Sequence, residues 1–591
     1  MNLNGEGGQG ASTDDGEKIF VPSFPFNGGP DWGLLGKFEP ATWTMAAGFQ
    51  LTAQFPALPV DIVFQKDVAV TLRDGVTIYA DILRPTGSEK VPVIMAWSPY
   101  GKSAGSTAPK RSALYGMLGL DARISGLEKF EGPDAAYWCQ HGYAICNPDA
   151  RGIADCEGDS NLLGRQEGQD ACDVIEWVAA QDWCTGKVAM SGTSYLAASQ
   201  WFAAAEQPPH LAAINPTEGF SDVYRDLLMR GGMPDFGFTD RLQSNFAGKG
   251  QREDLIGEAK RYPLMNKLWQ DKVARFDQIT VPAYIIASYS NTLHTRGTFR
   301  AWRRMASKEK WLRIHNTQEW PDYYDESTKE DLRKFYDYFL KGEANGWDET
   351  PRVRYSLLDM RGGDRINQSA TEFPPTDVSY EKFYLHGDSR IMTPNTPPTK
   401  VAVAAYLVDM GGMASFKLAF AEKTTLIGYP KARLFVEARG SDDMDLFFLV
   451  QKLDAYGSPL QQFTVPNHGA IMHDITENGS SILRYKGSYG RLRVSLRKLD
   501  EKLSTDIVPE HTFDQEEKLA PGEIAEIEID LSPVGLVFYP GESIRFIVSS
   551  NNILGAMMPF TPDVVPANRG QHVIHTGGSN ASYLQLPVQA R

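Results

Sequence analysis

Short apolar segments recur through the first 350 residues and alternate with segments of helical periodicity. The strand-like segments lie at 91–97 (VPVIMAW), 143–146 (YAIC), 188–190 (VAM), 281–287 (VPAYIIA) and 310–314 (KWLRI). Apolar residues at helical spacing follow at 170–181, and 298–306 also has helical character. Strands that alternate with helices predict a mostly parallel sheet with helices on both faces, that is, an α/β domain.

Two further regions depart from this pattern. Between residues 218 and 278 the pattern is helical without a strand signal, as expected for a cap inserted over a site. After about residue 351, short β-rich runs separated by Gly, Pro, Asn and Asp indicate a β-sandwich. The expected organisation is an N-terminal arm (1–60), an α/β domain (61–217 and 279–350), a helical cap (218–278) and a β-sandwich (351–591).

Composition narrows the class of protein. The chain of 591 residues is too long for one core, and its net charge of −15 without a basic cluster argues against nucleic-acid binding. No apolar run is long enough to cross a bilayer, and the polar, acidic N-terminus does not resemble a signal peptide. An odd cysteine count of five then favours reduced thiols and a cytoplasmic location. The oligomeric state is left open, with a homodimer as one option.

The strongest chemical signal is the segment 187–201, KVAMSGTSYLAASQW. A short apolar strand leads into a tight turn that carries Ser194, and a helix-forming segment follows. This is the layout of a nucleophile elbow, in which the serine hydroxyl is exposed above the sheet. Gly192 allows the strand and helix backbones to approach closely, while Leu196 occupies the place where a second glycine is usual.

Several ordered motifs resemble the cocaine esterase and X-prolyl dipeptidyl peptidase group of α/β-hydrolases. They are RDGVTIYADILRP at 73–85, SPYGK at 98–102, HGYAICNPDARG at 141–152, the segment 167–201 with the elbow, EGFSDVYRD at 218–226, LHTRGTF at 293–299, PVGLVFYPGESIRFIVSS at 533–550 and NRGQHVIHTGG at 568–578. The resemblance implies an α/β-hydrolase domain, a helical cap and a C-terminal all-β jelly roll of the galactose-binding-like type. It also implies acyl transfer through a serine, without a metal or cofactor.

A serine nucleophile needs a base, and histidine is the usual one. Two histidines follow late strands of the expected sheet: His294 after 281–287 and His315 at the end of 310–314. In an α/β-hydrolase the base lies on the loop after the last strand, which favours His315, with His294 as the reserve. A strict alignment to the family pattern places the base near Gln318.

The third member of a catalytic triad should be an acid on the loop after 281–287, where the resemblance implies an aspartate. This chain has Asn291 instead. An asparagine orients an imidazole but carries no charge to stabilise its protonated form. The alternatives are that the site is attenuated, or that Glu319 or Asp322 supplies the carboxylate.

The tetrahedral intermediate also needs donors for its oxyanion. The backbone N–H of Tyr195, next to the nucleophile, is one donor that an elbow supplies. The resemblance makes the hydroxyl of Tyr100, in the SPYGK motif, the second donor.

The sequence therefore predicts a serine hydrolase that cleaves an ester or amide of a small organic molecule through an acyl-enzyme on Ser194. Esterase activity is favoured over X-prolyl peptidase activity, because no acidic pair for a substrate amine can be placed. Two alternatives are kept: an acyltransferase or cyclase that uses the same site, and a binding protein that retains the fold without catalysis.

Overall fold

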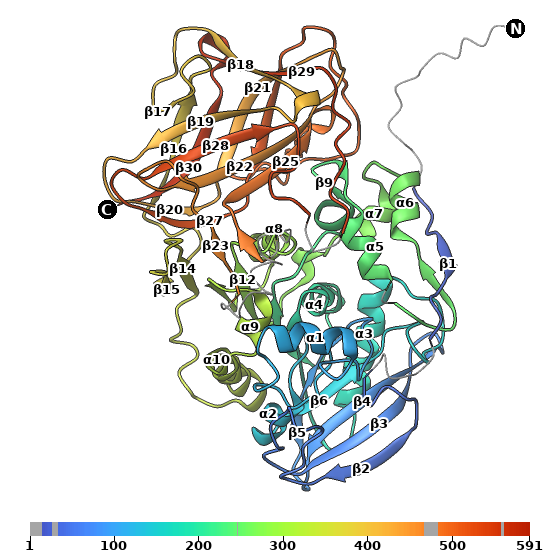
Figure 1. Ribbon diagram of the computed structural model, residues 1–591. Coiled ribbons are helices and arrows are strands. Elements are labelled where there is room, and N and C mark those ends of the chain that lie inside the picture. Colours follow the sequence, from blue (N-terminus) through green and yellow to red (C-terminus); the bar gives the residue numbers. More distant parts are fainter. Residues whose placement is uncertain are drawn as a thin grey trace, which may run out of the picture.

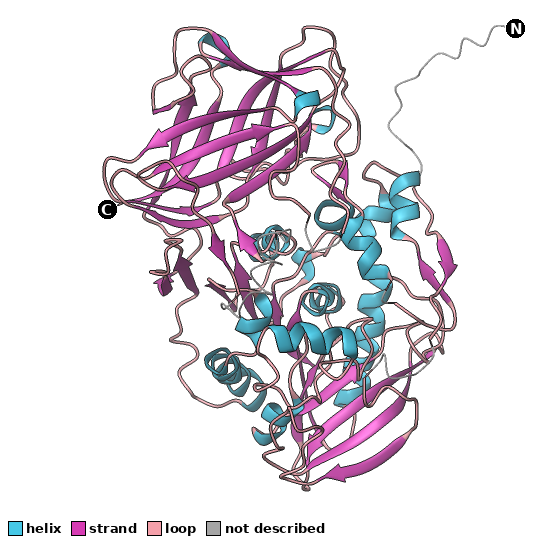
Figure 2. Cartoon of the chain, in the orientation of Figure 1, coloured by secondary structure: helices cyan, strands magenta, loops and turns pink. Residues whose placement is uncertain are grey.

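The computed structural model describes residues 15–26, 33–244, 246–465, 481, 483–556 and 561–590. Two β-rich bodies make up most of it (Figure 1). A large mixed sheet with flanking helices forms from residues before 371, and a β-sandwich forms from the rest (Figure 2).

The first body is built on an eleven-stranded sheet. Its strand order is β15 (Arg365–Ala370), β14 (Val353–Leu357), β13 (Lys310–His315), β12 (Ala283–Ser288), β8 (Leu211–Thr217), β7 (Cys184–Thr193), β5 (Val91–Met95), β6 (Ala144–Pro148), β4 (Thr77–Pro85), β3 (Ile62–Thr71) and β2 (Ala41–Met45). Neighbours from β6 to β14 are parallel, and the pairs at both ends are antiparallel. The predicted parallel sheet is thus the centre of a wider mixed one.

Side chains of the central strands alternate between two apolar layers, as the two-residue period of a strand requires. On β5, Met95 packs into one layer and Ile94 into the other. The first layer contains α3 (Arg165–Ala179), α4 (Tyr195–Ala205) and α8 (Thr295–Arg304), and the second contains α2 (Ala135–Gln140) and α10 (Glu326–Tyr336). Covering both faces explains why these strands are continuously apolar rather than alternating.

This sheet determines where a site can form. Because β5, β7, β8, β12 and β13 are parallel neighbours or near neighbours, the loops after them meet at one edge. Open α/β sheets bind ligands outside the carboxyl ends of their strands.

The segment 218–278 follows β8 and is only partly helical. It contains η2 (Tyr224–Leu228), β9 (Met229–Arg230), β10 (Met233–Pro234), α5 (Gly237–Gln243), β11 (Gln251–Glu253), α6 (Leu255–Arg261), α7 (Lys267–Asp271) and η3 (Phe276–Gln278). Strand β11 pairs with β1 (Phe20–Pro22), so the N-terminal segment packs along this region. Figure 1 shows α5, α6 and α7 beside β1, between the sheet and the sandwich.

The C-terminal body consists of two antiparallel sheets of a jelly-roll sandwich. The larger contains β17 (Met392–Pro394), β16 (Val378–Leu385), β30 (Tyr583–Gln589), β21 (Lys431–Arg439), β29 (Gln571–Thr576), β18 (Ala402–Leu407), β20 (Thr424–Gly428), β26 (Ala525–Asp530) and β27 (Val534–Phe538). The smaller contains β19 (Met413–Ala419), β28 (Ser543–Ser549), β22 (Asp445–Leu453) and β25 (Ser488–Arg493). A short pair, β23 (Gln462–Phe463) and β24 (Arg484–Tyr485), lies apart from both.

Two of the expected boundaries shift, and the segment 218–278 is less helical than expected. Strands β14 and β15 extend the first sheet past residue 350, because β14 pairs with β13. Strand β2, expected within an arm, pairs with β3 at the opposite edge. The segment 218–278 contains short strands whose two- or three-residue length is too small to give a periodic signal.

The five cysteines are buried and unpaired. Among the described residues, no helix combines the length and the apolar character that a membrane span requires.

Candidate active site

Ser194 lies at the turn between β7 and α4, in the left-handed region of the backbone at φ 59° and ψ −117°. Its N–H faces the carbonyl oxygens of Thr217 and Glu218 at 3.2 and 3.1 Å, which fixes the turn against the end of β8. Gly192 has φ 143°, and a Cβ there would lie 2.5 Å from that of Leu196. The elbow predicted from the sequence is therefore present, with the close approach that requires glycine.

Ser194 opens into a cavity of about 340 Å³. Its polar lining comes from loops after several strands of the sheet and from α1 (Pro109–Met117) and α5. These polar residues are Tyr100, Arg111, Glu131, Ser194, Arg241, Ser244, His294 and Glu319. The rest of the lining is mostly apolar, so the cavity suits a small organic molecule with a few polar groups.

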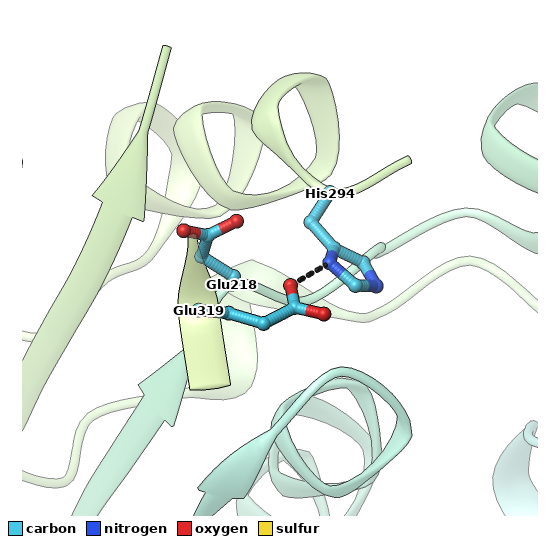
Figure 3. A group of neighbouring side chains, drawn as sticks. All are labelled: Glu218, His294 and Glu319. Carbon is cyan, nitrogen blue, oxygen red and sulfur yellow. Dashed lines mark hydrogen bonds and ion pairs between the residues drawn. The ribbon is translucent and has the colours of Figure 1, made fainter. Parts of the chain in front are cut away.

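His294 and Glu319 form a buried pair in this cavity. His294 directly precedes α8, in the loop after β12, and Glu319 begins α9 (Glu319–Tyr323), in the loop after β13. Nδ1 of His294 lies 2.7 Å from Oε2 of Glu319, and Figure 3 shows the other ring nitrogen pointing away from the carboxylate. That nitrogen, Nε2, is buried without a hydrogen-bond partner among the described residues. Nε2 is thus free to accept a proton.

Asn291 supports this pair from the same loop. Its Nδ2 donates to Oε2 of Glu319 at 2.5 Å, and its Oδ1 accepts from the backbone N–H of Leu293 and His294 at 3.1 and 3.2 Å. Nδ2 also lies 2.9 Å from Nδ1 of His294. Since both nitrogens face the same carboxylate oxygen, both act as donors to it. Asn291 therefore orients the carboxylate and the backbone that carries His294.

Burial controls the charges of the pair. It lowers the pKa of His294 to about 4, so the imidazole is neutral near pH 7. Burial and then the nearby charge of Glu218 raise the pKa of Glu319 well above 4.5. A carboxylate of raised pKa binds a proton tightly, and so it holds the Nδ1 proton firmly and stabilises an imidazolium that forms beside it.

His315 lies elsewhere. At the end of β13, its Nε2 is 2.5 Å from Oε1 of Glu218 and its Nδ1 is 3.8 Å from Oδ1 of Asp322. Burial alone would lower the pKa of His315, but the charges of Asp322 and Glu218 outweigh burial and raise it. His315 is not part of the cavity lining that contains Ser194. The structure thus brings His294 into the cavity and leaves the favoured His315 within an ion-paired group behind it.

Asp322, the other acid considered, pairs with Arg313 through both carboxylate oxygens. Its carboxyl group is buried and, despite burial, the charges of Arg313 and then His315 lower its pKa. Asp322 therefore has a structural partner, and among the two acids on this loop it is Glu319 that lines the cavity.

The expected oxyanion donors are both placed at Ser194. Tyr195 is the first residue of α4, so its N–H has no partner within the helix, while its hydroxyl donates to Glu167 at 2.7 Å. Tyr100 lines the same cavity as Ser194, and the side chain of Ser194 is one of the groups that act on its hydroxyl. Burial raises the pKa of Tyr100 well above 10, so the hydroxyl keeps the proton that an oxyanion donor needs.

Three residues of this region were not predicted from the sequence as site residues. Glu131 and Arg111 line the cavity, and Glu218 pairs with His315. Glu131 and Glu218 have positive φ values of 66° and 50°, a strained conformation that clusters at functional sites. Glu218 begins the EGFSDVYRD motif but was not expected at the site, and no motif marks Glu131 or Arg111, because all three reach the site through the tertiary fold.

Glu218, His294 and Glu319 bring potential metal-ligand atoms within 4.8 Å of one another (Figure 3). Two of these groups already have partners in the protein: Glu319 accepts from His294 and Asn291, and Glu218 faces His315. A metal ion would have to displace these contacts. The donor set therefore fits an acid–base pair better than a metal centre.

Comparisons with known proteins agree with the fold and the chemistry of the elbow. Residues 74–318 match the family model of the X-Pro dipeptidyl-peptidase (S15 family), and residues 345–585 match that of the X-Pro dipeptidyl-peptidase C-terminal non-catalytic domain. Among curated proteins, cocaine esterase from Rhodococcus sp. is 23% identical over 616 residues, covering 89% of this chain and 98% of that protein.

Solved structures show similarity over the whole molecule. A CocE/NonD family hydrolase from Staphylococcus aureus superimposes with a TM-score of 0.85 at 32% identity, covering 94% of this chain and 98% of that one. An α-amino acid ester hydrolase shares the fold, with a TM-score of 0.63 at 17% identity and 92% of this chain covered. The α/β body and the β-sandwich are therefore both present in these relatives, in the same order along the chain.

Proposed function

The chain belongs to the CocE/NonD family of hydrolases, and we propose that Ser194, His294 and Glu319 are its catalytic triad. The protein is a serine hydrolase that cleaves ester or amide bonds. One observation carries the triad: in the cavity that contains Ser194, His294 donates from Nδ1 to Glu319, while its Nε2 has no partner among the described residues. This is the tautomer that a general base requires.

In the proposed acylation, Nε2 of His294 takes the hydroxyl proton as Oγ of Ser194 attacks the substrate carbonyl. The developing oxyanion accepts hydrogen bonds from the N–H of Tyr195 and the hydroxyl of Tyr100. The imidazolium, stabilised by Glu319, then gives its proton to the leaving alcohol or amine. The products of this half-reaction are the free leaving group and an ester on Ser194.

Deacylation repeats these roles with water as the nucleophile. His294 takes a proton from water, the hydroxide oxygen attacks the acyl carbon, and the proton returns to Oγ of Ser194 as the bond breaks. The nucleophile, base and oxyanion donors come from the loops after β5, β7 and β12, and the carboxylate comes from the loop after β13. Preorganisation of these groups on adjacent strand ends supports catalysis rather than binding alone.

We further propose an ester of a small molecule as the substrate, with segment 218–278 as a cap over it. Phe238 and Leu242 of α5 belong to the cavity lining, as do Leu293 and Phe130. An apolar wall of this kind holds an acyl or alcohol group and excludes water from the acyl-enzyme.

A cytoplasmic location is a further proposal. It is supported by the five buried, unpaired thiols, which are typical of reducing compartments. Cell fractionation with an antibody to the native protein tests it, and recovery from the extracellular medium would contradict it.

Labelling with a fluorophosphonate probe tests the proposed nucleophile. Peptide mapping should find the probe on Ser194, and Ser194→Ala should lose both labelling and hydrolysis of 4-nitrophenyl butyrate. A folded Ser194→Ala variant that keeps turnover would overturn the proposal. Adding an alcohol acceptor to the same assay distinguishes hydrolysis from acyl transfer by its product.

A further inference from the structure

The cavity contains a cation that the proposed mechanism does not use. Arg111 lies on α1 and lines the cavity together with Ser194, although its side chain is mostly withdrawn from solvent. Among the described residues, it forms no ion pair with a carboxylate within 4 Å. A desolvated guanidinium without a counter-ion is costly, and an anionic ligand would relieve that cost.

The orientation of Arg111 is fixed by the protein. Its Nη1 donates to the carbonyl oxygens of Tyr100, at 2.9 Å, and of Ala104. The guanidinium lies over the rings of Phe130 and Tyr100, 4.6 and 5.5 Å from their centroids. These contacts use one nitrogen and stack the group against two neighbouring aromatic rings. Nε and Nη2 donate to no described residue, and this is the edge that binds a carboxylate through two parallel hydrogen bonds.

Glu131 lines the same cavity and is a candidate counter-ion, but its contacts argue against that role. Its Oε1 accepts from Nε1 of Trp320 at 2.8 Å, and its Oε2 is buried without a partner among the described residues. Burial, and then the charge of Glu319, raise the pKa of Glu131 well above 4.5, which disfavours its ionised form. Glu131 thus pairs with Trp320 rather than with Arg111, and no carboxylate of the described residues lies within 4 Å of the guanidinium.

The position of Arg111 relates it to the reacting atoms. Tyr100 carries the guanidinium over its ring and lines the cavity together with Ser194. An anion bound to Arg111 therefore lies about one aromatic ring away from the scissile carbonyl. Arg241 of α5 also lines the cavity and adds to its positive character.

We propose that Arg111 binds a carboxylate of the substrate, so that the enzyme prefers esters that carry a carboxylate a few bonds from the ester group. This inference rests on the proposed function of the same site. The expected substrate combines that carboxylate with an apolar body that packs against the aliphatic and aromatic lining.

Two matched pairs of esters test this preference. Mono-4-nitrophenyl glutarate and its methyl ester differ by a carboxylate in the acyl group, and 4-acetoxybenzoate and its methyl ester differ by one in the leaving group. The wild-type kcat/KM, corrected for spontaneous hydrolysis, should be higher for the anionic member of at least one pair. In Arg111→Gln the anionic-to-neutral ratio should fall about 10- to 100-fold, the size expected for a charge-assisted hydrogen bond.

The ratio is the readout because Arg111 also holds the backbone of Tyr100, so its loss lowers the turnover of both esters together. Arg111→Lys should restore part of the ratio. The control is Arg123→Gln: Arg123 pairs with Asp325 at 3.5 Å on the surface, and its loss should leave the ratio unchanged. A ratio near one in the wild type, or one that Arg111→Gln does not change, would overturn the inference.

A binding measurement separates this inference from the catalytic one. Glutarate should bind to Ser194→Ala by calorimetry, and the double variant Ser194→Ala/Arg111→Gln should lose that binding. Fluorophosphonate labelling without glutarate binding would reject the carboxylate site and keep the hydrolase. Glutarate binding without labelling would support the carboxylate site and reject Ser194 as the nucleophile. If Arg111→Gln does not fold, Arg111→Lys in both assays decides the question.

Discussion

The loops after β12 and β13 differ from the family pattern in an informative way. That pattern has an acid after the first of these strands and a histidine after the second. Here His294 follows β12 and Glu319 follows β13, and the two meet at 2.7 Å. Because parallel neighbours end at the same edge of the sheet, either loop can supply either group. The chemistry needs the contact between imidazole and carboxylate, not a fixed order of the two along the chain.

The two histidines on these loops are also instructive. One nitrogen of His294 pairs with Glu319, the other has no partner within the described part of the chain, and burial keeps the imidazole neutral. His315 lies between Glu218 and Asp322, whose charges raise its pKa. A base must be neutral with an available lone pair, whereas a structural cation must stay charged and paired. The environment, rather than the residue type, separates these roles.

Substituting each histidine in turn should give the largest difference. His294→Ala should lower kcat by about four to six orders of magnitude, as expected for the base of a serine triad. His315→Gln should lower kcat much less but reduce the free energy of unfolding by about 3 kcal/mol, because Glu218 loses its buried partner. Ester kinetics and urea unfolding measure both. A stable, inactive His315→Gln beside an active His294→Ala would reverse the assignment.

The two acids of the second loop give the next largest contrast. Glu319→Gln should lower kcat by about three to four orders of magnitude, since the amide cannot stabilise the imidazolium. The matched control is Asp322→Asn, which breaks the pair with Arg313 outside the cavity and should affect stability more than kcat. A folded Asp322→Asn variant with a strongly reduced kcat would instead identify Asp322 as the catalytic acid.

Tyr100, the proposed oxyanion donor on the loop after β5, lies outside the loops after β12 and β13 and serves as a reference. Tyr100→Phe should lower kcat about 10- to 1,000-fold with little change in KM, because its hydrogen bond strengthens as the oxyanion forms. Steady-state kinetics on 4-nitrophenyl butyrate measure this. An unchanged kcat would place the donor elsewhere.

A smaller effect should come from restoring an acid to the family position. In Asn291→Asp, a second carboxyl group would face Oε2 of Glu319, which now accepts from Nδ2 at 2.5 Å. Repulsion between the two groups should lower kcat/KM about tenfold to a hundredfold. A rise in activity would instead show that the first loop still supplies the acid, with Glu319 in a secondary role.

The fold and the elbow could be predicted from the sequence because both depend on local patterns. Apolar periodicity gave the parallel strands, and the small residue at Gly192 marked the turn that carries Ser194. The short strands of the cap and the shift of β14 and β15 to the first sheet could not be predicted, since they depend on pairing partners far along the chain.

The sequence limits the candidates for the catalytic base and acid to a few residues, but it does not decide among them. The sequence places His294, His315, Glu319 and Asp322 near the same strand ends, and only side-chain direction separates them. His315 is the last residue of β13 and pairs with Glu218 beside it, while Glu319 reaches the cavity by starting α9. Arg111 and Glu131 had no local signal, because α1 and the loop before α2 meet Ser194 only in the folded chain.

The pH dependence of kcat/KM is the finest test of the comparison between the two loops. The proposed mechanism needs ionised Glu319 and neutral His294, so a proton added to the pair should remove activity. Because burial and Glu218 raise the pKa of Glu319 above 4.5, kcat/KM should be full at high pH and fall as the pH drops through that raised value. In Glu319→Gln only the imidazole remains to titrate, and its residual activity should fall near the pKa of about 4 of His294. The acid limb should therefore move to lower pH in the variant, as measured from pH 3.5 to 9 with a neutral ester. An acid limb near pH 6.5 in both proteins would indicate an ordinary solvated histidine as the base, and the exchanged pair would have to be abandoned.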